Sequence, residues 1–459
     1  MNRTSFSAVC PSPPYKIRWF WVNGAPLAEE QVKKIRTVPL LEHLPEFYTV
    51  RFTSLAQPMV RGAVAYIGSV EGEVFALDTL TGQTRWRSAA SGQILHSVTV
   101  GKEAVYAASL RGVDAFGPDG RKLWTFQDPR LASFYCCPAL AEGESMVLAG
   151  SLSGFFYGLD SRTGKAAWEF KAGAAIYHTP AVHGQSVIFG AEDMHVYCLD
   201  ARSGKLLWKS ERLPGISFGH YWPVIAAQAG KVLLRTSPFV KCAGCEAVSK
   251  APFDYEKAQD ALREHFEKNP NHRDFFVLNL SDGKEALRVA TGHFGSQGDI
   301  APVPIVRDDG SVLAWHYSKE GSFQPHSKWG AYDEPADFGL LDFQSGRFKP
   351  LGPAGTTRPP SITRNDDYHH NTLGGKWLFG VQDRLSFGCV PLDGQGPRYN
   401  WEMHEKVRDS QKQGLVGFLG RCEAGAVCAT ITRDAVFINP HNGLYILALE
   451  SAPAGKGTR

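Results

Sequence analysis

The chain has 459 residues, of which 21% are charged, and its formal net charge is only +3. This near balance argues against a nucleic-acid-binding surface, which would require clustered positive charge. No apolar run approaches the length of a membrane-spanning helix, so a transmembrane segment is not expected.

The first part of the chain, residues 1–53, lacks the repeat described below and is predicted to be an N-terminal extension that caps the rest. The apolar run Trp19–Val22 is too short for the core of a signal peptide. We therefore expect a cytoplasmic protein. A periplasmic or extracellular location is the alternative if the N-terminus is incomplete.

A unit of four short strands recurs from residue 54 onwards, most clearly as MVLAGSLSGFFYGLDSRTGKAAW over Met146–Trp168. Two alternating strands are followed by a turn with Gly, and a tryptophan lies in the next strand. The same pattern recurs about every 40 residues, a period typical of β-propeller blades. The tryptophans at this spacing are Trp86, Trp124, Trp168 and Trp208, and we expect them to pack between blades. The matching acidic residues are expected to be turn residues and are Asp78, Asp160 and Asp200.

The remaining chain contains more degenerate copies of the unit. We predict an all-β fold, an eight-bladed β-propeller of four-stranded antiparallel blades over 54–449, with seven blades as the alternative. Insertions are expected at 238–272 and 319–337, and a disordered tail at 450–459. The first insertion contains an apolar stripe at helical spacing, which Asn269-Pro270 should end: Tyr255, Ala258, Leu262 and Phe266. This helix could lie over the central opening as a lid.

The repeat G-S-x-x-G-x-x-x-x-L-D-x-x-T-G-x-x-x-W resembles that of the PQQ-type quinoprotein propellers. That superfamily also includes the non-enzymatic scaffold lipoprotein of the outer-membrane β-barrel assembly machinery. The resemblance is strongest over 54–212 and implies the propeller fold. It leaves the function open, because the motif consists of turn and packing residues.

One face of the predicted ring carries both insertions and the starts of the innermost strands, which surround the mouth of the central channel. Long loops gathered on one face are typical of a binding surface. Five of the chain's 15 histidines fall at or near these strand starts. The candidate ligand-binding residues at the mouth are His96, His178, His220, Tyr221, Asp299, His369 and His370. These histidines could bind a metal, an anion or a peptide, or could simply line a water-filled opening.

Two cysteine pairs have more than one interpretation. Cys136-Cys137 is similar to the adjacent-cysteine disulfide that packs on PQQ in quinoprotein alcohol dehydrogenases. Here Pro138 and a strand follow at once, so two thiols are expected in preference to a vicinal disulfide. Cys242-x-x-Cys245 predicts a local disulfide or a free pair, since a zinc half-site would need ligands from elsewhere.

These observations favour a non-catalytic interaction or scaffold protein that binds a protein or peptide partner through its loop-rich face. A monomer without a cofactor is expected. The alternative is an oxidoreductase that holds PQQ or a transition metal at the histidine-lined mouth. The two hypotheses can be distinguished by testing whether the purified protein binds PQQ or a metal.

Overall fold

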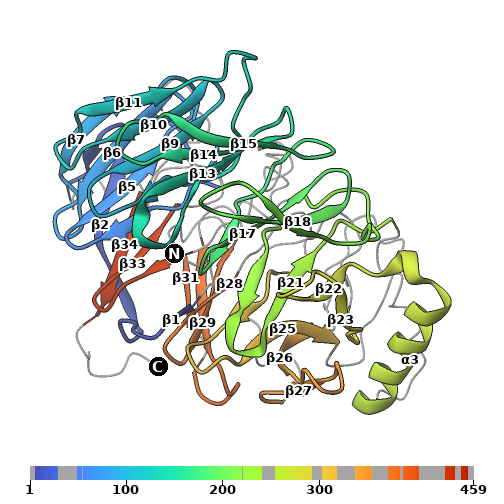
Figure 1. The fold of residues 1–459 in the computed structure, drawn as a ribbon. Coiled ribbons are helices and arrows are strands. Elements are labelled where there is room, and N and C mark those ends of the chain that lie inside the picture. Colours follow the sequence, from blue (N-terminus) through green and yellow to red (C-terminus); the bar gives the residue numbers. More distant parts are fainter. Residues whose placement is uncertain are drawn as a thin grey trace, which may run out of the picture.

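The computed structural model contains eight β-sheets arranged around a ring, each built on four antiparallel strands (Figure 1). The protein is thus an eight-bladed β-propeller, as predicted, and the alternative of seven blades is wrong. Among the described residues, no helix is long and apolar enough to cross a membrane. The structure describes residues 6–28, 49–53, 55–219, 221–239, 254–291, 302–317, 336–353, 371–382, 386–397, 399–402, 429–439 and 446–452.

The first four blades follow the repeats seen in the sequence, each from its innermost to its outermost strand. Blade one contains β4 (Met59–Arg61), β5 (Val64–Gly68), β6 (Glu73–Asp78) and β7 (Thr84–Ala89). Blade two contains β8 (Thr99–Val100), β9 (Val105–Ser109), β10 (Gly112–Phe116) and β11 (Lys122–Phe126). Blade three contains β12 (Ala139–Leu140), β13 (Met146–Gly150), β14 (Phe155–Asp160) and β15 (Ala166–Lys171). Blade four contains β16 (Ala181–His183), β17 (Ser186–Ala191), β18 (His195–Asp200) and β19 (Leu206–Lys209).

Blades five to seven keep the same order despite their longer connections. Blade five contains β20 (Val224–Ala226), β21 (Lys231–Arg235), β22 (Phe275–Asn279) and β23 (Glu285–Leu287). Blade six contains β24 (Ile305–Val306), β25 (Val312–Tyr317), β26 (Ala336–Leu341) and β27 (Phe348–Pro350), so β26 begins just before the predicted end of the second insertion. Blade seven contains β28 (Asn371–Gly374), β29 (Trp377–Gln382), β30 (Ser386–Pro391) and β31 (Tyr399–Glu402).

Blade eight is assembled from both ends of the chain. Its three inner strands are β32 (Thr430–Ile431), β33 (Val436–Ile438) and β34 (Ile446–Ser451). Its fourth strand is β2 (Tyr15–Val22), which pairs antiparallel with β34 and is followed by β3 (Ala25–Pro26). The prediction of a separate cap over 1–53 is therefore wrong for β2, and the ring begins at residue 15. The predicted tail is also too long, because β34 continues to Ser451.

The N-terminal segment also reaches the inner edge of the neighbouring blade. β1 (Phe6–Ser7) pairs in parallel with β28, the innermost strand of blade seven. The chain then passes from that inner edge to the outer edge of blade eight, where β2 begins. Residues 6–22 therefore connect two adjacent blades.

Apolar side chains fill the spaces between blades. Between blades three and four, the ring of Phe156 stacks on that of Phe189 with centroids 4.2 Å apart. The repeated tryptophans pack in the outer part of four of these interfaces. Trp124 donates its indole N–H to the carbonyl of Ser161 in the next blade at 2.9 Å, and its ring lies against Gly164. Gly164 has a φ of +71°, and a Cβ there would meet the indole at 2.5 Å, so both the turn and the packing require glycine.

The same tryptophan contact recurs at five successive interfaces and so joins six blades, from blade eight through blade one to blade five. Each indole donates to a turn carbonyl of the following blade in the pairs Trp19–Thr79, Trp86–Pro118, Trp124–Ser161, Trp168–Ala201 and Trp208–Leu280. The prediction that the four repeat tryptophans occupy equivalent sites is confirmed, although Trp86 and Trp168 are only half-buried. Trp19 of β2 is a fifth member, and it joins blade eight to blade one.

The predicted helix is present as α3 (Tyr255–Lys268) at the periphery of the molecule (Figure 1). Asp254 caps its first turn by accepting from the Lys257 N–H at 3.1 Å. Its buried residues, among them Leu262 and Phe266, pack on Tyr317 of blade six. The expectation that the helix forms a lid over the channel is wrong. Its apolar stripe is buried against blade six instead.

Candidate functional site

The loops fall on two faces. Connections between second and third strands, and those that lead into innermost strands, lie on one face, here called the insertion face. The opposite face carries short turns, in which an aspartate accepts backbone N–H groups. Asp78 accepts from the N–H groups of Leu80 and Thr81 at 3.0 and 2.9 Å, and the hydrogen bond from Arg85, together with these backbone bonds, lowers the pKa of its carboxyl to about 2. Asp160 and Asp200 make the same bonds, so the prediction that these aspartates are turn residues is confirmed.

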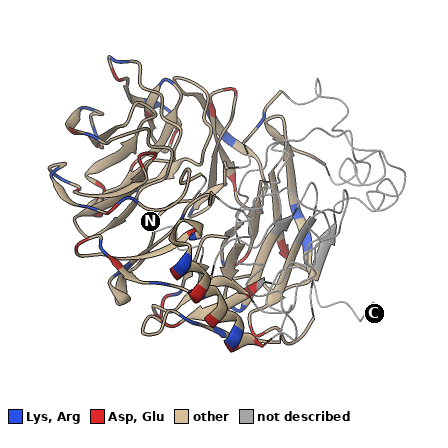
Figure 2. Cartoon of the chain, turned by 90° about the vertical axis from the view of Figure 1, so that its right-hand side faces the viewer, with Lys and Arg blue, Asp and Glu red and all other residues tan. Residues whose placement is uncertain are grey.

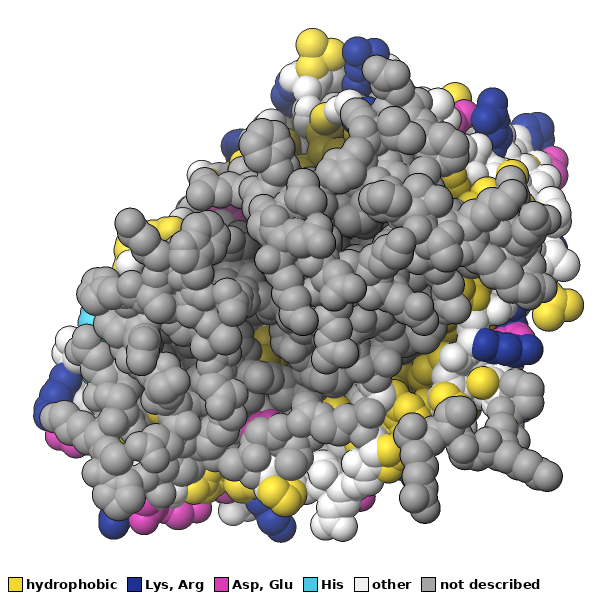
Figure 3. All heavy atoms as spheres, turned by 180° about the vertical axis from the view of Figure 1, so that it is seen from behind, with side chains coloured by type: hydrophobic (Ala, Val, Ile, Leu, Met, Phe, Trp, Pro, Cys, Tyr) yellow, Lys and Arg dark blue, Asp and Glu magenta, His cyan; other side chains and the backbone are white. Residues whose placement is uncertain are grey.

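Four large apolar side chains are exposed on the insertion face in blades two to five, and we call them the apolar tip group. Three come from loops that lead into innermost strands and one from the start of the first insertion. Their exposed fractions are 89% for Leu131, 39% for Tyr177, 60% for Ile216 and 52% for Phe239. Apolar side chains also lie among charged ones on the face seen in Figure 3. Basic and acidic residues are interspersed along the blades (Figure 2). The apolar tip group is therefore distinguished from the rest of the surface by its exposed apolar side chains more than by charge.

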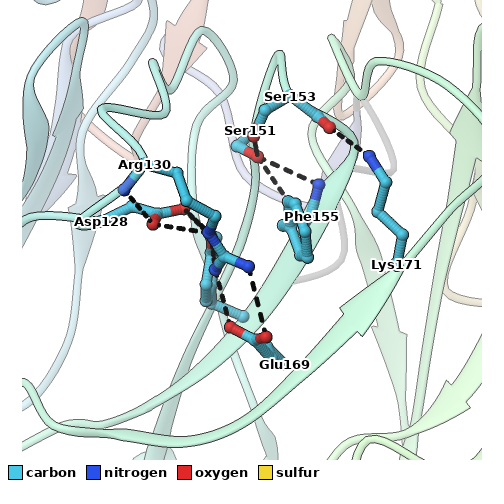
Figure 4. Close-up of polar contacts among 8 residues, drawn as sticks. Asp128, Arg130, Ser151, Ser153, Phe155, Glu169 and Lys171 are labelled. Carbon is cyan, nitrogen blue, oxygen red and sulfur yellow. Dashed lines mark hydrogen bonds and ion pairs between the residues drawn. The ribbon is translucent and has the colours of Figure 1, made fainter.

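Leu131 lies at the tip of a loop that is held by a charged network. Figure 4 shows Arg130 between Asp128 and Glu169, and its Nε and Nη2 lie 2.8 and 2.7 Å from their carboxylates. The guanidinium also covers the ring of Phe155, with Cζ 3.7 Å from the centroid. The Leu131 N–H donates to the Asp128 carbonyl at 2.8 Å, and Leu131 has a φ of +57°. The loop is therefore tightly turned at the residue that it exposes.

Asp128 is the buried anchor of this network. Burial alone would raise the pKa of its carboxyl, but hydrogen bonds from Arg130 and Tyr157 hold that pKa below its usual value. Tyr157 donates its hydroxyl to Asp128, and burial together with this carboxylate raises the pKa of the phenol. The charged network is thus stable at neutral pH. The sequence analysis did not single out these residues, for which the only signal was an apolar residue, Leu131, directly after the charged segment Asp128–Arg130.

The exposed residues of blades four and five are also held in place. An antiparallel bridge joins Ser217 to Ser237, and the Ile216 N–H donates to the Ser237 carbonyl at 3.0 Å. The bridge brings the segment that carries Ile216 next to the one that leads to Phe239. Tyr177 is supported by an edge contact with Tyr135, with ring centroids 5.9 Å apart.

The described channel-mouth candidates have partners within their own or neighbouring blades. His96 is buried, and its Nδ1 accepts the Ser97 N–H at 2.9 Å. His178 is buried with its Nε2 3.3 Å from Glu192 Oε1, and its ring meets that of Phe218 edge-on. Burial would raise the pKa of the Glu192 carboxyl, but the hydrogen bonds that it accepts, above all the one from His178, hold that pKa below its usual value. Tyr221 belongs to the apolar core between blades five and six.

The other predicted mouth residues lie outside the described residues: His220, Asp299, His369 and His370. Within the described part of the chain, no three His, Cys, Asp or Glu side chains gather as a metal site.

The adjacent cysteines are not joined in a disulfide, and their sulfur atoms face different partners. Cys136 Sγ lies 3.4 Å from the Gly150 carbonyl of its own blade, whereas Cys137 Sγ lies 3.0 Å from Thr99 Oγ1 of blade two. Both are almost fully buried. This arrangement does not fit a vicinal disulfide exposed to a planar cofactor such as PQQ. Cys242 and Cys245 lie outside the described residues.

Comparison with known proteins relates the chain to two groups. It is 28% identical over 163 residues to the outer membrane protein assembly factor BamB of Burkholderia pseudomallei (strain K96243), covering 32% of this chain and 42% of that protein. It is 35% identical over 89 residues to a polyvinylalcohol dehydrogenase of Pseudomonas sp, covering 18% of this chain and 13% of that protein. The matches thus span less than half of either relative.

The fold is shared with a solved structure of low sequence similarity. The computationally designed Ika8 protein superposes with a TM-score of 0.53 at 11% identity, covering 87% of this chain and 97% of that one. A family model described as outer membrane protein assembly factor BamB matches residues 41–136 and 108–329. Because these matches together cover more than half of the chain, the protein belongs to the BamB family of outer membrane protein assembly factors.

Proposed function

We propose that this protein is a non-catalytic scaffold that binds a protein partner through the apolar tip group on its insertion face. The observation that carries the proposal is the exposure of Leu131, Tyr177, Ile216 and Phe239 from one face of four successive blades. Large apolar side chains grouped on one face of a protein are typical of an interaction surface.

The rigidity of the loops supports the same function. Arg130 secures the loop of Leu131, and the Ser217–Ser237 bridge secures those of Ile216 and Phe239. A side chain that is already held in its bound position loses little conformational entropy on association. Preorganised apolar anchors of this kind contribute most of the binding energy in many interfaces.

Membership of the BamB family suggests which partner to test. Proteins of that description assist the assembly of outer membrane proteins, so we propose a protein of the outer membrane assembly apparatus as the partner. Its binding site should present an apolar pocket to Leu131 and Ile216.

The test compares Leu131→Asp/Ile216→Asp with Leu80→Asp in the native organism. Leu80 is 67% exposed but belongs to a turn on the opposite face, so it is a matched control. A buried interface would have to desolvate two new carboxylates, so we expect the double variant to lose about 100-fold in affinity for the assembly apparatus. Cross-linked co-purification and the level of outer membrane proteins measure this loss.

Leu80→Asp should behave as wild type, and circular dichroism should show that all variants fold. Retention of the partner by the double variant would overturn the proposal. Equal loss in the Leu80 variant would do the same, because it would place the interface elsewhere.

The alternative function is that of an oxidoreductase with PQQ or a metal at the channel mouth, favoured by the match to polyvinylalcohol dehydrogenase. The local partners of His96 and His178 and the buried thiols of Cys136 and Cys137 do not support it. Dye-linked alcohol oxidation after addition of PQQ and calcium would establish the alternative and displace the scaffold.

A further inference from the structure

Leu131 has a backbone conformation that leucine rarely adopts. Its φ is +57°, in the left-handed region where the Cβ of an ordinary residue is crowded by the backbone. Four described residues other than glycine have a positive φ. Leu131 differs from the other three because its apolar side chain is 89% exposed, the largest exposed fraction of any large apolar side chain among the described residues.

The other three residues are explained by their surroundings. Asn23 lies in the turn between β2 and β3, and asparagine tolerates the left-handed conformation better than most residues. Glu144 accepts the Lys102 N–H with its carboxylate at 2.6 Å. Met194 is buried in the apolar core between blades four and five. The side chain of Leu131 has no polar group and lies almost wholly in water, so none of these reasons applies to it.

The turn that Leu131 ends is one in which glycine is the ordinary residue at this position. The Leu131 N–H donates to the Asp128 carbonyl at 2.8 Å, which closes a β-turn over Asp128–Leu131. The commonest β-turn favours Asp at its first position, Pro at its second and Gly at its fourth. Asp128 and Pro129 follow this preference, and Leu131 departs from it. The backbone alone would therefore favour glycine where the chain has leucine.

Arg130 holds the turn in this conformation. Its backbone N–H donates to Asp128 Oδ1 at 2.9 Å, and its guanidinium lies between the carboxylates of Asp128 and Glu169 (Figure 4). The same guanidinium donates to the Tyr157 hydroxyl at 2.8 Å. Ala132, directly after the turn, is buried, so the chain is also held on that side. A strained residue persists only where its surroundings determine the backbone in this way, and such residues are concentrated at functional sites.

We propose that Leu131 serves partner binding and not folding: the fold would be at least as stable with glycine, and leucine is present for the contact that its side chain makes. The inference rests on the proposed scaffold function, and it names a residue at which binding and stability have opposite requirements. Burial of one leucine side chain in an apolar pocket of the partner would strengthen binding about 10- to 100-fold.

The unfolding midpoints of Leu131→Gly and Leu131→Ala test the backbone part of the proposal without any partner. At a position with an ordinary φ, glycine is less stable than alanine because its unfolded chain has more conformational freedom. At Leu131 the glycine variant should unfold at or above the midpoints of both wild type and the alanine variant. Leu80 is the matched control, since it is exposed and does not have a positive φ, and there the alanine variant should be the more stable. A midpoint of Leu131→Gly below either wild type or Leu131→Ala would overturn the proposal.

Quantitative co-purification with the outer membrane assembly apparatus of the native organism tests the side chain. Leu131→Gly should bind about 10- to 100-fold more weakly than wild type, whereas Leu131→Met, which restores an apolar side chain of similar volume, should keep most of the affinity. Leu80→Gly should bind as wild type. Full binding by Leu131→Gly together with loss in Leu131→Asp/Ile216→Asp would overturn the role of Leu131 and leave the scaffold function standing. Full binding by both variants would overturn both.

Discussion

At the scale of single residues, the contact between a tryptophan and a left-handed glycine joins neighbouring blades. Trp124 is 8% exposed, and its ring fills the space above Gly164. Trp124→Ala removes this packing and the hydrogen bond to Ser161, so we expect a loss of about 3 kcal/mol in the free energy of unfolding. Chemical denaturation measures it. Leu123→Ala, on the same strand but 39% exposed, should cost less than about 1 kcal/mol, and equal losses would contradict the account.

A second single residue makes stability depend on pH. His316 is buried between Tyr255 of α3 and Phe348 of β27, and burial lowers the pKa of its imidazole from 6.5 to about 4. Between these values the unfolded chain binds a proton that the folded protein does not. Stability should therefore be complete above pH 6.5 and fall as the pH drops towards 4, by up to about 3 kcal/mol.

Denaturation curves of wild type and His316→Gln across this pH range test the assignment. The variant should lose the part of the pH dependence that one proton contributes. An unchanged slope would assign the pH dependence to other groups.

At the scale of elements, β2 closes the ring. It covers the edge of β34 with main-chain hydrogen bonds, and Trp21 fills the core between blades eight and one. Deletion of residues 1–22 would expose both the strand edge and the apolar core, and exposed edges promote association. We expect this variant to form soluble aggregates by size-exclusion chromatography with light scattering. Deletion of 453–459 should leave the size unchanged, and a monomeric 1–22 deletion would show that the ring closes without β2.

The helix α3 covers the outer strand edge of blade six, as β2 covers the edge of β34. The Gln259 side chain accepts the Phe348 N–H at 2.7 Å and donates to the Phe348 carbonyl at 3.2 Å. A side-chain amide thus replaces the next strand along the outer edge, and Arg347 adds an ion pair to Glu256. Protection of an outermost strand is a structural role for the insertion, separate from any role in binding.

At the scale of the whole molecule, the two faces of the ring have different tasks. The face of short aspartate turns supplies the glycines and carbonyls that receive the tryptophans, so it contributes to stability. The loops of the insertion face do not take part in the tryptophan contacts, and this face carries the apolar tip group and the long connections. Because each blade contacts only its neighbours, loops can vary on one face without disturbing the interfaces.

The sequence by itself determined the eight blades, the tryptophan interfaces and the helix over Tyr255–Lys268, because these depend on local periodicity and turn residues that are close in the chain. Only the tertiary structure decided how the ring closes, since Trp19 lies outside the repeats and reaches Thr79 of blade one through a strand paired with the C-terminal end. It also placed α3 on blade six instead of over the channel, because an apolar stripe specifies burial without specifying a partner. The candidate site changed for the same reason. Histidines at strand starts were visible in the sequence, but the burial of His178 against Phe218, and the anchoring of the Leu131 loop by Glu169, arise from contacts between segments distant along the chain.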